Sequence, residues 1–244
     1  MTEKLCNPEW ERARQDIRDN LDRIHEQIAA ACARAGRRME EVTLLGVTKT
    51  VPVEKINLAI EMGIGEIGEN RVQEYLSKRE SLLPVKTHLI GHLQTNKAAQ
   101  IVDKVDMIQS VDSLRLAAAL QAAAEKKDVT VDILAEVNIG EEESKSGVSP
   151  ADAVTFCEEM RAFSRLRLRG LMTVPPISDT ERKKREYFSR MSQLFIDIRT
   201  KNVDNSNMNI LSMGMSDDFV EAILEGSTMV RIGSAIFGKR QYNI

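Results

Sequence analysis

Hydrophobic side chains in the N-terminal part of the chain recur at helical spacing, with Arg, Asp and Glu on the opposite face. The spaced positions are Trp10, Ile17, Leu21, Ile24 and Ile28. Because a surface helix buries one such stripe, the pattern predicts a long amphipathic helix over residues 8–35 that packs on the remaining domain. Gly36 follows, and a glycine at this position commonly ends a helix.

After this helix the pattern changes to short hydrophobic runs, separated by segments rich in Ala, Glu, Lys and Leu. The runs are Val42–Val47, Gly65–Gly68, Thr87–Ile90, Met107–Val111, Val131–Val137, Leu166–Val174, Asn209–Met213 and Thr228–Ile232. The runs suit strands, and the segments between them, such as Leu114–Lys126 and Arg182–Arg199, suit helices.

Strand and helix segments therefore alternate along the chain, which implies a parallel sheet. Eight such units in 244 residues favour a closed (β/α)8 TIM barrel, with an open doubly wound sheet as the alternative. No linker rich in Pro, Gly or Ser divides the chain, so we expect a single domain over residues 1–244.

The composition is that of an ordinary soluble protein, with 42% hydrophobic and 29% charged residues. The formal net charge of -3 argues against nucleic acid or an anionic membrane as a partner. Cys6, Cys32 and Cys157 are scattered and form no CxxC, so they predict neither a disulfide framework nor a zinc site. Without a signal peptide or an apolar run of bilayer length, we expect a cytoplasmic protein that binds no metal.

In a barrel of this type, chemistry is expected at the C-terminal ends of the strands. The polar residues at those ends are Lys49, Asn70, His92, Asn138, Thr173, Ser212 to Ser216, and Arg231 to Ser234. Gly233 lets the backbone approach a ligand closely, and Ser234 offers a hydroxyl and an N–H, which is typical of a phosphate site. Ser216, in the preceding loop LSMGMSDD, adds a second hydroxyl. Alternatively, Gly233 is only a tight turn and Ser216 only the N-cap of the next helix.

Two basic residues at these ends have a possible chemical role. Strand alternation places Lys49 on the same face as Leu45 and Val47; inside a barrel its amine would be poorly solvated and available as a nucleophile or Schiff-base partner. An exposed loop lysine is the alternative. Arg231 lies within a hydrophobic strand, so its guanidinium needs an anionic ligand or a buried carboxylate, such as that of Glu69 or Glu136.

Other motifs are less specific. Asn70 and Gln73 in GENRVQE have the spacing of a capping box, so Asn70 alternatively only starts a helix. His92 is expected at the barrel mouth, but a single histidine is commonly structural. Lys145, in the charged loop GEEESKSG, is expected on a solvated flap. No GxSxG, P-loop, HExxH or GxGxxG motif supports hydrolase, Walker-type or Rossmann chemistry.

The motifs GVTKT, GENRVQE, HLIGHLQTNK, NIGEEESKSG, LRGLMTVPP, LSMGMSDDF and GSTMVRIGSAIFG follow one another over nearly the whole chain after the first helix. Together they resemble the pyridoxal 5′-phosphate (PLP) homeostasis protein family, the YggS/PROSC group. The resemblance implies a barrel similar to the N-terminal domain of alanine racemase. Members of the family hold PLP on this barrel without a known catalytic turnover.

The same resemblance implies the site residues. Lys49 would hold PLP as a reversible Schiff base (an aldimine), and Arg231 would face the pyridine nitrogen. Ser212, Gly233 and Ser234 would hold the phosphate. Asn70 would line the ring pocket, and Met213 and Ser216 would belong to the loop beside it. Ser234 differs from the Thr of many relatives but keeps the hydroxyl and the N–H.

An arginine facing the ring disfavours a protonated pyridine nitrogen, and this weakens carbanion stabilisation. Racemases of this type also take a second base, a tyrosine, from a partner subunit that has a second β domain. Tyr75, Tyr187 and Tyr242 fall in predicted helices or in the tail, and the chain ends at Ile244 directly after the barrel. We therefore expect a non-catalytic PLP-binding protein of vitamin B6 homeostasis, with at most vestigial racemase-like activity.

Two other functions stay open. One is a PLP-dependent amino-acid racemase, and the other is a phosphate-binding barrel enzyme without PLP, in which Lys49 is a general base or an electrostatic clamp. The resemblance also suggests PLP-dependent apo-enzymes as partners, and the expected lack of a second domain favours a monomer.

Overall fold

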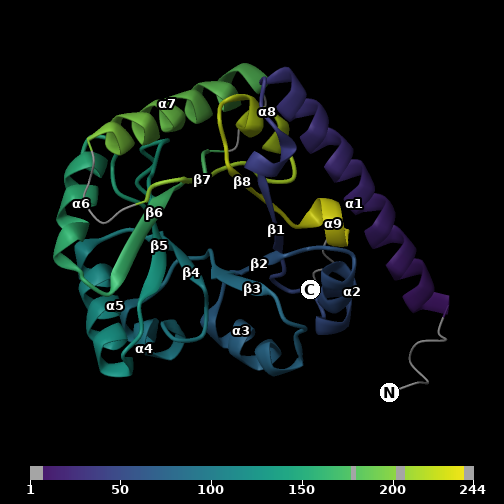
Figure 1. Ribbon diagram of the computed structural model, residues 1–244, viewed down its shortest axis with the longest axis horizontal. Helices are drawn as coiled ribbons and strands as arrows, with labels where there is room; N and C mark the ends of the chain where they lie inside the picture. The colour runs from purple at the N-terminus through teal and green to yellow at the C-terminus, as the bar shows by residue number, and fades with distance from the viewer. Residues whose placement is uncertain (1–7, 177–179, 202–206, 239–244) are drawn as a thin grey trace.

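Eight parallel strands form a closed barrel in a computed structural model that describes residues 8–176, 180–201 and 207–238 (Figure 1). The strands follow chain order around the barrel, and β1 pairs with β8 to close it. They are β1 (Thr43–Val47), β2 (Glu66–Glu69), β3 (Lys86–Leu89), β4 (Met107–Val111), β5 (Val131–Glu136), β6 (Leu166–Met172), β7 (Ile210–Ser212) and β8 (Met229–Ile232). The predicted TIM barrel is confirmed, and every predicted run overlaps a strand.

Helices surround this barrel on the outside (Figure 1). They are α1 (Pro8–Arg34), α2 (Val53–Glu61), α3 (Val72–Lys78), α4 (Ala98–Ile101), α5 (Leu114–Lys127), α6 (Ala153–Glu159), α7 (Glu181–Thr200), α8 (Phe219–Leu224) and α9 (Ser234–Phe237). Short 3-10 turns cover Met39–Glu41, Arg79–Ser81, Thr95–Lys97 and Met160–Ala162. The helices predicted from residues 114 and 182 onward are thus confirmed as α5 and α7.

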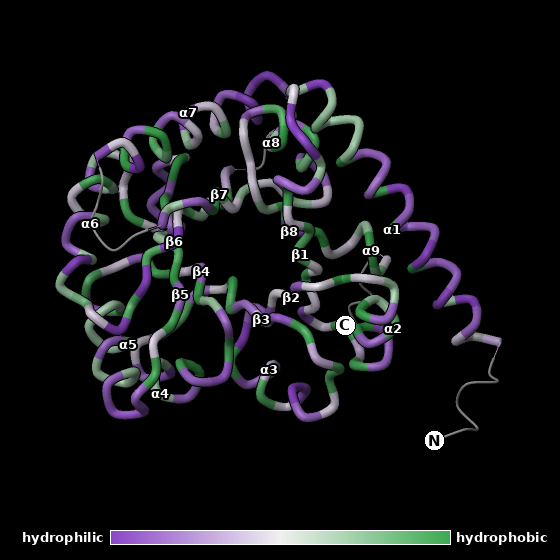
Figure 2. Tube along the Cα trace, in the orientation of Figure 1, coloured by the Kyte–Doolittle hydropathy of each residue, from purple (hydrophilic) through white to green (hydrophobic). Residues whose placement is uncertain are grey.

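The long first helix, α1, runs across the outside of the barrel and contacts α2, α8 and α9 (Figure 1). Its buried stripe contains Ile17, Leu21, Ile24 and Ile28, as predicted. Figure 2 shows that its outer turns are predominantly hydrophilic. The helix ends before Gly36, whose φ of 67° favours glycine. Within the described part of the chain, no helix has both the length and the apolarity that a membrane span needs.

The strands bury side chains on both faces. Outward residues such as Ile67, Ile133 and Val230 pack against the helices in two large clusters. Inward residues form two small apolar layers, one of Leu45, Val47 and Met229 and one of Met107, Leu134 and Met172. The inward faces also bear buried polar residues, among them His88, Gln109 and Ser212. Gln109 lies beside the first layer, with its Nε2 3.2 Å from Sδ of Met229.

Candidate functional site

The predicted site residues on β1, β7 and β8 meet at the C-terminal end of the barrel. Register pairs Leu45 with Arg231, while Ser212 ends β7. Gly233 lies tightly against the end of β1, because a Cβ added to Gly233 would stand 3.2 Å from both the Cβ and the carbonyl oxygen of Val47. The turn after β8 is therefore packed against the residue that precedes Lys49 by two positions.

Lys49 occupies the turn that follows β1. Leu45 and Val47 face the barrel interior, which confirms the alternation used to place that face of the strand. Lys49 itself is half-buried, between buried Thr48 and exposed Thr50. It is therefore not the fully exposed loop lysine that the sequence left as an alternative.

Arg231 is buried inside the barrel, with 3% of its surface exposed. Its Nη1 donates to Ser212 Oγ and its Nη2 to the carbonyl oxygen of Thr173, each at 2.7 Å. Burial lowers the pKa of Arg231 to about 10, against the opposing effect of the Glu136 and Asp218 carboxylates, so the guanidinium stays cationic at neutral pH. Both of these bonds go to neutral oxygens.

The ion pair that the sequence offered for Arg231 is not formed by the described residues. Glu69 faces α3 instead, and its Oε1 lies 2.9 Å from Nζ of Lys78. Glu136 affects Arg231 electrostatically but makes no hydrogen bond to it. The sequence could not show this, because the partner of Glu69 comes from the following helix. A cation without a bonded carboxylate thus lies beneath the barrel mouth.

A chain of hydrogen bonds continues from Arg231 through the barrel. Ser212 Oγ donates to Gln109 Oε1 at 2.7 Å, and Gln109 Nε2 lies 2.8 Å from Nδ1 of His88. An amide nitrogen can only donate, so His88 Nδ1 accepts and the proton lies on Nε2, which is 3.2 Å from Glu66 Oε2. Ser212 is therefore committed to Arg231 and Gln109. Our sequence analysis missed Gln109, although a polar residue within the buried run MIQSV was a usable signal.

Ser216 connects the loop after β7 to the turn after β8. Its Oγ accepts from the backbone N–H of Gly233 at 3.3 Å and of Ala235 at 3.4 Å. The N-cap alternative for Ser216 is wrong, since Asp218 is the residue that precedes α8. The carboxylate of Asp218 accepts from the Met215 N–H. Two N–H groups beside Ser234, the first residue of α9, thus converge on one oxygen atom.

Two buried acceptor atoms of the site have no hydrogen-bond partner among the described residues. They are Oδ1 of Asn70 and Oε2 of Glu136. Asn70 does not cap α3, which begins at Val72 after Arg71. Burial, reinforced by the Asp112 carboxylate, raises the pKa of Glu136 to about 7, although Arg231 opposes the shift. The sequence offered Glu136 only as an ion-pair partner of Arg231, and the structure places it near Arg231 with an unpartnered oxygen instead.

Other predicted positions lie apart from this group. Met213 packs in the outer core between sheet and helices, so its side chain faces away from the barrel interior. The side chain of His92 is 56% exposed, with Nδ1 3.1 Å from both Asp112 Oδ2 and Ser146 Oγ. Asn138 bonds to the backbone of Glu142 and so shapes the loop that contains exposed Lys145.

The tyrosines considered as a second base are also distant from Arg231 or lie outside the described residues. The hydroxyl of Tyr75 donates to the carbonyl oxygen of Lys104 at 2.5 Å. Tyr187 lies on α7 and packs against the outer core. Tyr242 and Cys6 fall outside the described residues.

Comparison with known proteins gives a consistent assignment. Residues 20–241 match the family model described as alanine racemase, N-terminal domain. The chain is 42% identical over 226 residues to the pyridoxal phosphate homeostasis protein of Aquifex aeolicus. This alignment covers 92% of this chain and 98% of the relative.

Two solved structures show the same fold. PipY of Synechococcus elongatus, solved with PLP bound, is 31% identical with a TM-score of 0.76 and covers 88% of this chain and 100% of its own. Alanine racemase of Clostridium difficile 630 has a TM-score of 0.75 at 16% identity, covering 94% of this chain and 58% of the racemase. The racemase shares the barrel, and at this identity the likeness extends to the fold alone.

Proposed function

Because this chain belongs to the pyridoxal phosphate homeostasis protein family, we propose that it binds PLP through Lys49 and contributes to PLP homeostasis without catalytic turnover. The observation that supports the proposal best is the meeting of three groups at one end of the barrel. These are the turn of Lys49, the buried cation of Arg231, and the N–H groups around Gly233.

The residues present fit PLP chemically. The N–H groups of Gly233 and Ala235 point to one place, which Ser216 Oγ occupies at 3.3 and 3.4 Å. Because these bonds are long and end on a neutral oxygen, a phosphate oxygen would be a stronger acceptor for the same N–H groups. The close contact of Gly233 with Val47 lets the backbone come near a ligand. The unpartnered Oδ1 of Asn70 is an acceptor that a ligand's hydroxyl or a water can satisfy.

We assign the phosphate to Ser216, Gly233 and Ser234, and the ring pocket to Asn70. Ser212 was expected at the phosphate as well, but its hydroxyl already donates to Gln109 and accepts from Arg231. Its role in the proposal is therefore to hold Arg231 in place. Met213 contributes the backbone of the adjoining loop, since its side chain packs in the outer core.

PLP supplies an aldehyde, to which an unprotonated lysine amine adds with loss of water, so that the attachment is reversible by hydrolysis. Lys49 is half-buried in the turn that follows β1, and such a position would shield its amine partly from water. Such an attachment keeps a reactive aldehyde available but contained, which suits a protein that stores and delivers it.

Two features of the site support storage over turnover. Arg231 stays cationic, and a cation facing the pyridine nitrogen disfavours its protonation, which weakens the electron sink that amino-acid chemistry needs. Tyr75 and Tyr187, the tyrosines within the described ranges, are held in the outer core and offer no second base. We also propose a cytoplasmic monomer that supplies PLP to PLP-dependent apo-enzymes.

Absorbance of the purified protein, at about 300 to 500 nm, followed by borohydride reduction and peptide mapping, tests the attachment. We expect a coloured protein in which reduction fixes PLP on Lys49. Lys49→Ala should lose the reducible adduct but keep phosphate-dependent binding. A protein that stays colourless with saturating PLP contradicts the proposal and favours a barrel with an anion site only.

The racemase alternative has a separate test. A racemase removes the α-proton of a bound amino acid, so it exchanges that proton with solvent. We expect no deuterium exchange at the α-carbon of alanine or serine above that caused by free PLP. Faster exchange that requires Lys49 overturns the non-catalytic part of the proposal and leaves PLP binding intact.

A further inference from the structure

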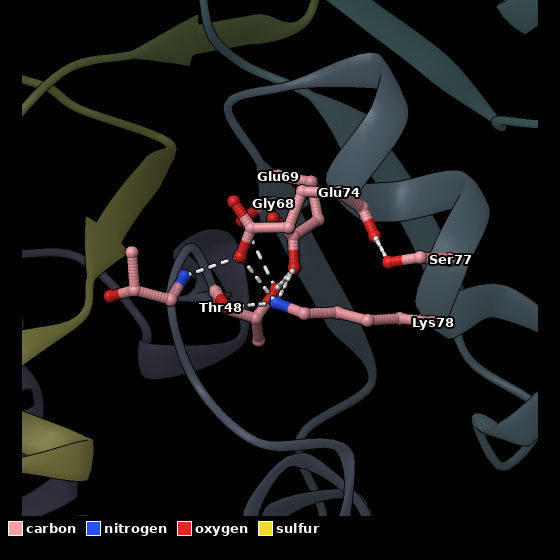
Figure 3. Close-up of polar contacts among 7 residues, drawn as sticks. Thr48, Gly68, Glu69, Glu74, Ser77 and Lys78 are labelled. Carbon is pink, nitrogen blue, oxygen red and sulfur yellow. Dashed lines mark hydrogen bonds and ion pairs between the residues drawn. The ribbon is translucent and has the colours of Figure 1, made fainter.

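A cluster of ion-paired side chains lies beside the turn that contains Lys49 (Figure 3). Lys78, the last residue of α3, extends its ammonium between Thr48 and the carboxylates of Glu69 and Glu74. Its Nζ donates to the Thr48 carbonyl oxygen at 2.9 Å, to Glu69 Oε1 at 2.9 Å and to Glu74 Oε1 at 2.6 Å. An ammonium has three N–H donors, so these acceptors use all of them.

Glu74 makes a second contact with the same turn. Its Oε1 also accepts from the backbone N–H of Thr50 at 2.5 Å. The Thr48 carbonyl belongs to the peptide unit that precedes the Lys49 Cα, and the Thr50 N–H belongs to the unit that follows it. Since φ and ψ are the only soft backbone dihedrals of a residue, holding both peptide units fixes the backbone of Lys49.

The turn needs such support. Thr50 has a φ of 63°, a conformation that is unfavourable for a β-branched residue and persists only where surrounding contacts impose it. The Thr48 carbonyl also accepts from the Val51 N–H at 3.0 Å, but that bond is internal to the turn. Lys78 and Glu74 connect these two peptide units to α3.

The part of the cluster formed by Lys78, Glu69 and Thr48 is shielded from water, while the side chain of Glu74 is 21% exposed. The side chains of Lys78 and Glu69 are 12% and 1% exposed. Thr48, fully buried, donates its hydroxyl to Glu69 Oε1 at 2.8 Å. Burial raises the pKa of Glu69, although Lys78 opposes it. A surface ion pair that only fastens α3 to the barrel would not require this burial or contacts on both sides of one residue.

We propose that Lys78 and Glu74 are positioning residues, which hold the backbone of Lys49 in the orientation that its amine needs to attach a PLP aldehyde at the barrel mouth. The inference rests on the proposed function, because it concerns the reactivity of Lys49 towards that ligand. It assigns to α3 a role that none of the site residues on β7 and β8 performs.

Glu74→Ala tests the role, with Glu74→Gln as the conservative variant and Glu80→Ala as the matched control. Glu80, just after α3, has an exposed side chain, and its ion pair within the described ranges is with its neighbour Arg79. We expect Glu74→Ala to reduce the rate of formation of the borohydride-reducible adduct on Lys49 about tenfold or more. Glu74→Gln keeps an acceptor for the Thr50 N–H and should recover most of the rate. Binding of a PLP analogue that lacks the aldehyde, measured by equilibrium dialysis, reports the non-covalent contacts alone and should change little.

A readout without PLP separates positioning from general destabilisation. Acetic anhydride labels each lysine amine at a rate set by its accessibility and ionisation, and mass spectrometry reports the rate for Lys49 relative to exposed Lys86. We expect this ratio, as a function of pH, to change in Glu74→Ala and to match the parent protein in Glu80→Ala. If Glu74→Ala has the same Lys49 to Lys86 labelling ratio and the same adduct rate as the parent protein, the proposal is overturned.

Lys78→Met alone leaves the buried Glu69 carboxylate unpaired and is expected to destabilise the fold. The double variant Lys78→Met, Glu69→Gln removes that charge, and Glu69→Gln alone is its control. We expect both to melt cooperatively, while only the double variant loses adduct formation on Lys49. If the double variant forms the adduct at the parent rate, Lys78 is not a positioning residue.

The outcomes distinguish this inference from the proposed function. If the parent protein itself forms no adduct on Lys49, the proposed function fails and the positioning role fails with it. If parent, Glu74→Ala and the double variant form the adduct equally, only the positioning role is overturned.

Discussion

The hydroxyl of Ser212 accepts a hydrogen bond from Nη1 of Arg231 at 2.7 Å, and both residues are buried. The same hydroxyl donates to Gln109, so its single proton and one of its lone pairs are both in use. The orientation of the Arg231 cation at the barrel mouth is thereby set from below, by a serine and a glutamine on two other strands.

Ser212→Ala should destabilise the protein, since it leaves a donor of a buried cation and an amide oxygen unpaired. We expect a loss of about 1 to 3 kcal/mol in the free energy of unfolding, measured by urea denaturation. PLP affinity should fall as well, because Arg231 is no longer oriented. Ser164→Ala, at an exposed position, is the control and should stay within about 0.5 kcal/mol of the parent. If Ser212→Ala and Ser164→Ala lose the same free energy of unfolding, the bond between Ser212 and Arg231 does not stabilise the fold.

Gly233→Ala should weaken phosphate-anchored binding. The added Cβ would meet Val47 at 3.2 Å, so the turn after β8 must shift away from β1. We expect about a tenfold loss of PLP affinity in an absorbance titration, and a cost of about 1 to 3 kcal/mol in stability. Gly65→Ala is the matched control, because a Cβ at Gly65 meets no atom within 4 Å. Parent-like affinity in Gly233→Ala would show that the close approach is not needed.

Glu136 should make the apo-protein less stable as pH rises. Its pKa of about 7 in the fold lies above the ordinary 4.5, so the folded state favours the protonated form. The parent therefore loses stability between these two pH values, whereas Glu136→Gln does not. We expect Glu136→Gln to be more stable than the parent by on the order of 3 kcal/mol at about pH 8, and equal to it at about pH 4.5.

Urea denaturation across this pH range measures the difference, with exposed Glu159→Gln as the control. Asp112 and Arg231 are the charged groups that affect Glu136, and both are present in parent and variant. A stability difference between Glu136→Gln and the parent that does not vary with pH would show that Glu136 does not titrate in this range.

Removing one buried side chain of α1 should show that this helix is part of the stable domain. Ile24 is fully buried against the barrel helices, so Ile24→Ala should cost about 2 to 5 kcal/mol in thermal or urea unfolding. Ile196→Ala is the matched control, since Ile196 is 49% exposed on α7. If Ile24→Ala behaves like Ile196→Ala, α1 is only loosely attached.

The strands were predictable because each buries both faces and so appears as a short hydrophobic run; β8 and its following Gly233 are the clearest case. The turn of Lys49 and the burial of Arg231 followed from the same alternation. The hydrogen-bond and ion-pair partners of these residues could not be predicted in this way. Lys78 reaches Glu69 across a strand and a helix, and Ser216 binds N–H groups beyond β8; spacing along the chain reports neither contact. Local capping rules misplaced Ser216 because its hydroxyl accepts from the N–H groups of Gly233 and Ala235 instead. They misplaced Asn70 because α3 begins one residue later than expected, at Val72 after Arg71.

The pairing of β1 with β8 has a consequence for the order of events in the cell. A ligand that touches both Lys49 and Gly233 needs the first and the last strand together, and β8 is synthesised last. At about 5 to 20 residues per second, Lys49 leaves the ribosome some 10 to 40 s before Arg231 does. The nascent chain has an amine but no anion cradle during that interval. Under the proposed function, PLP therefore loads only after β8 has joined the barrel, and we expect a product truncated before β8 to sequester no aldehyde.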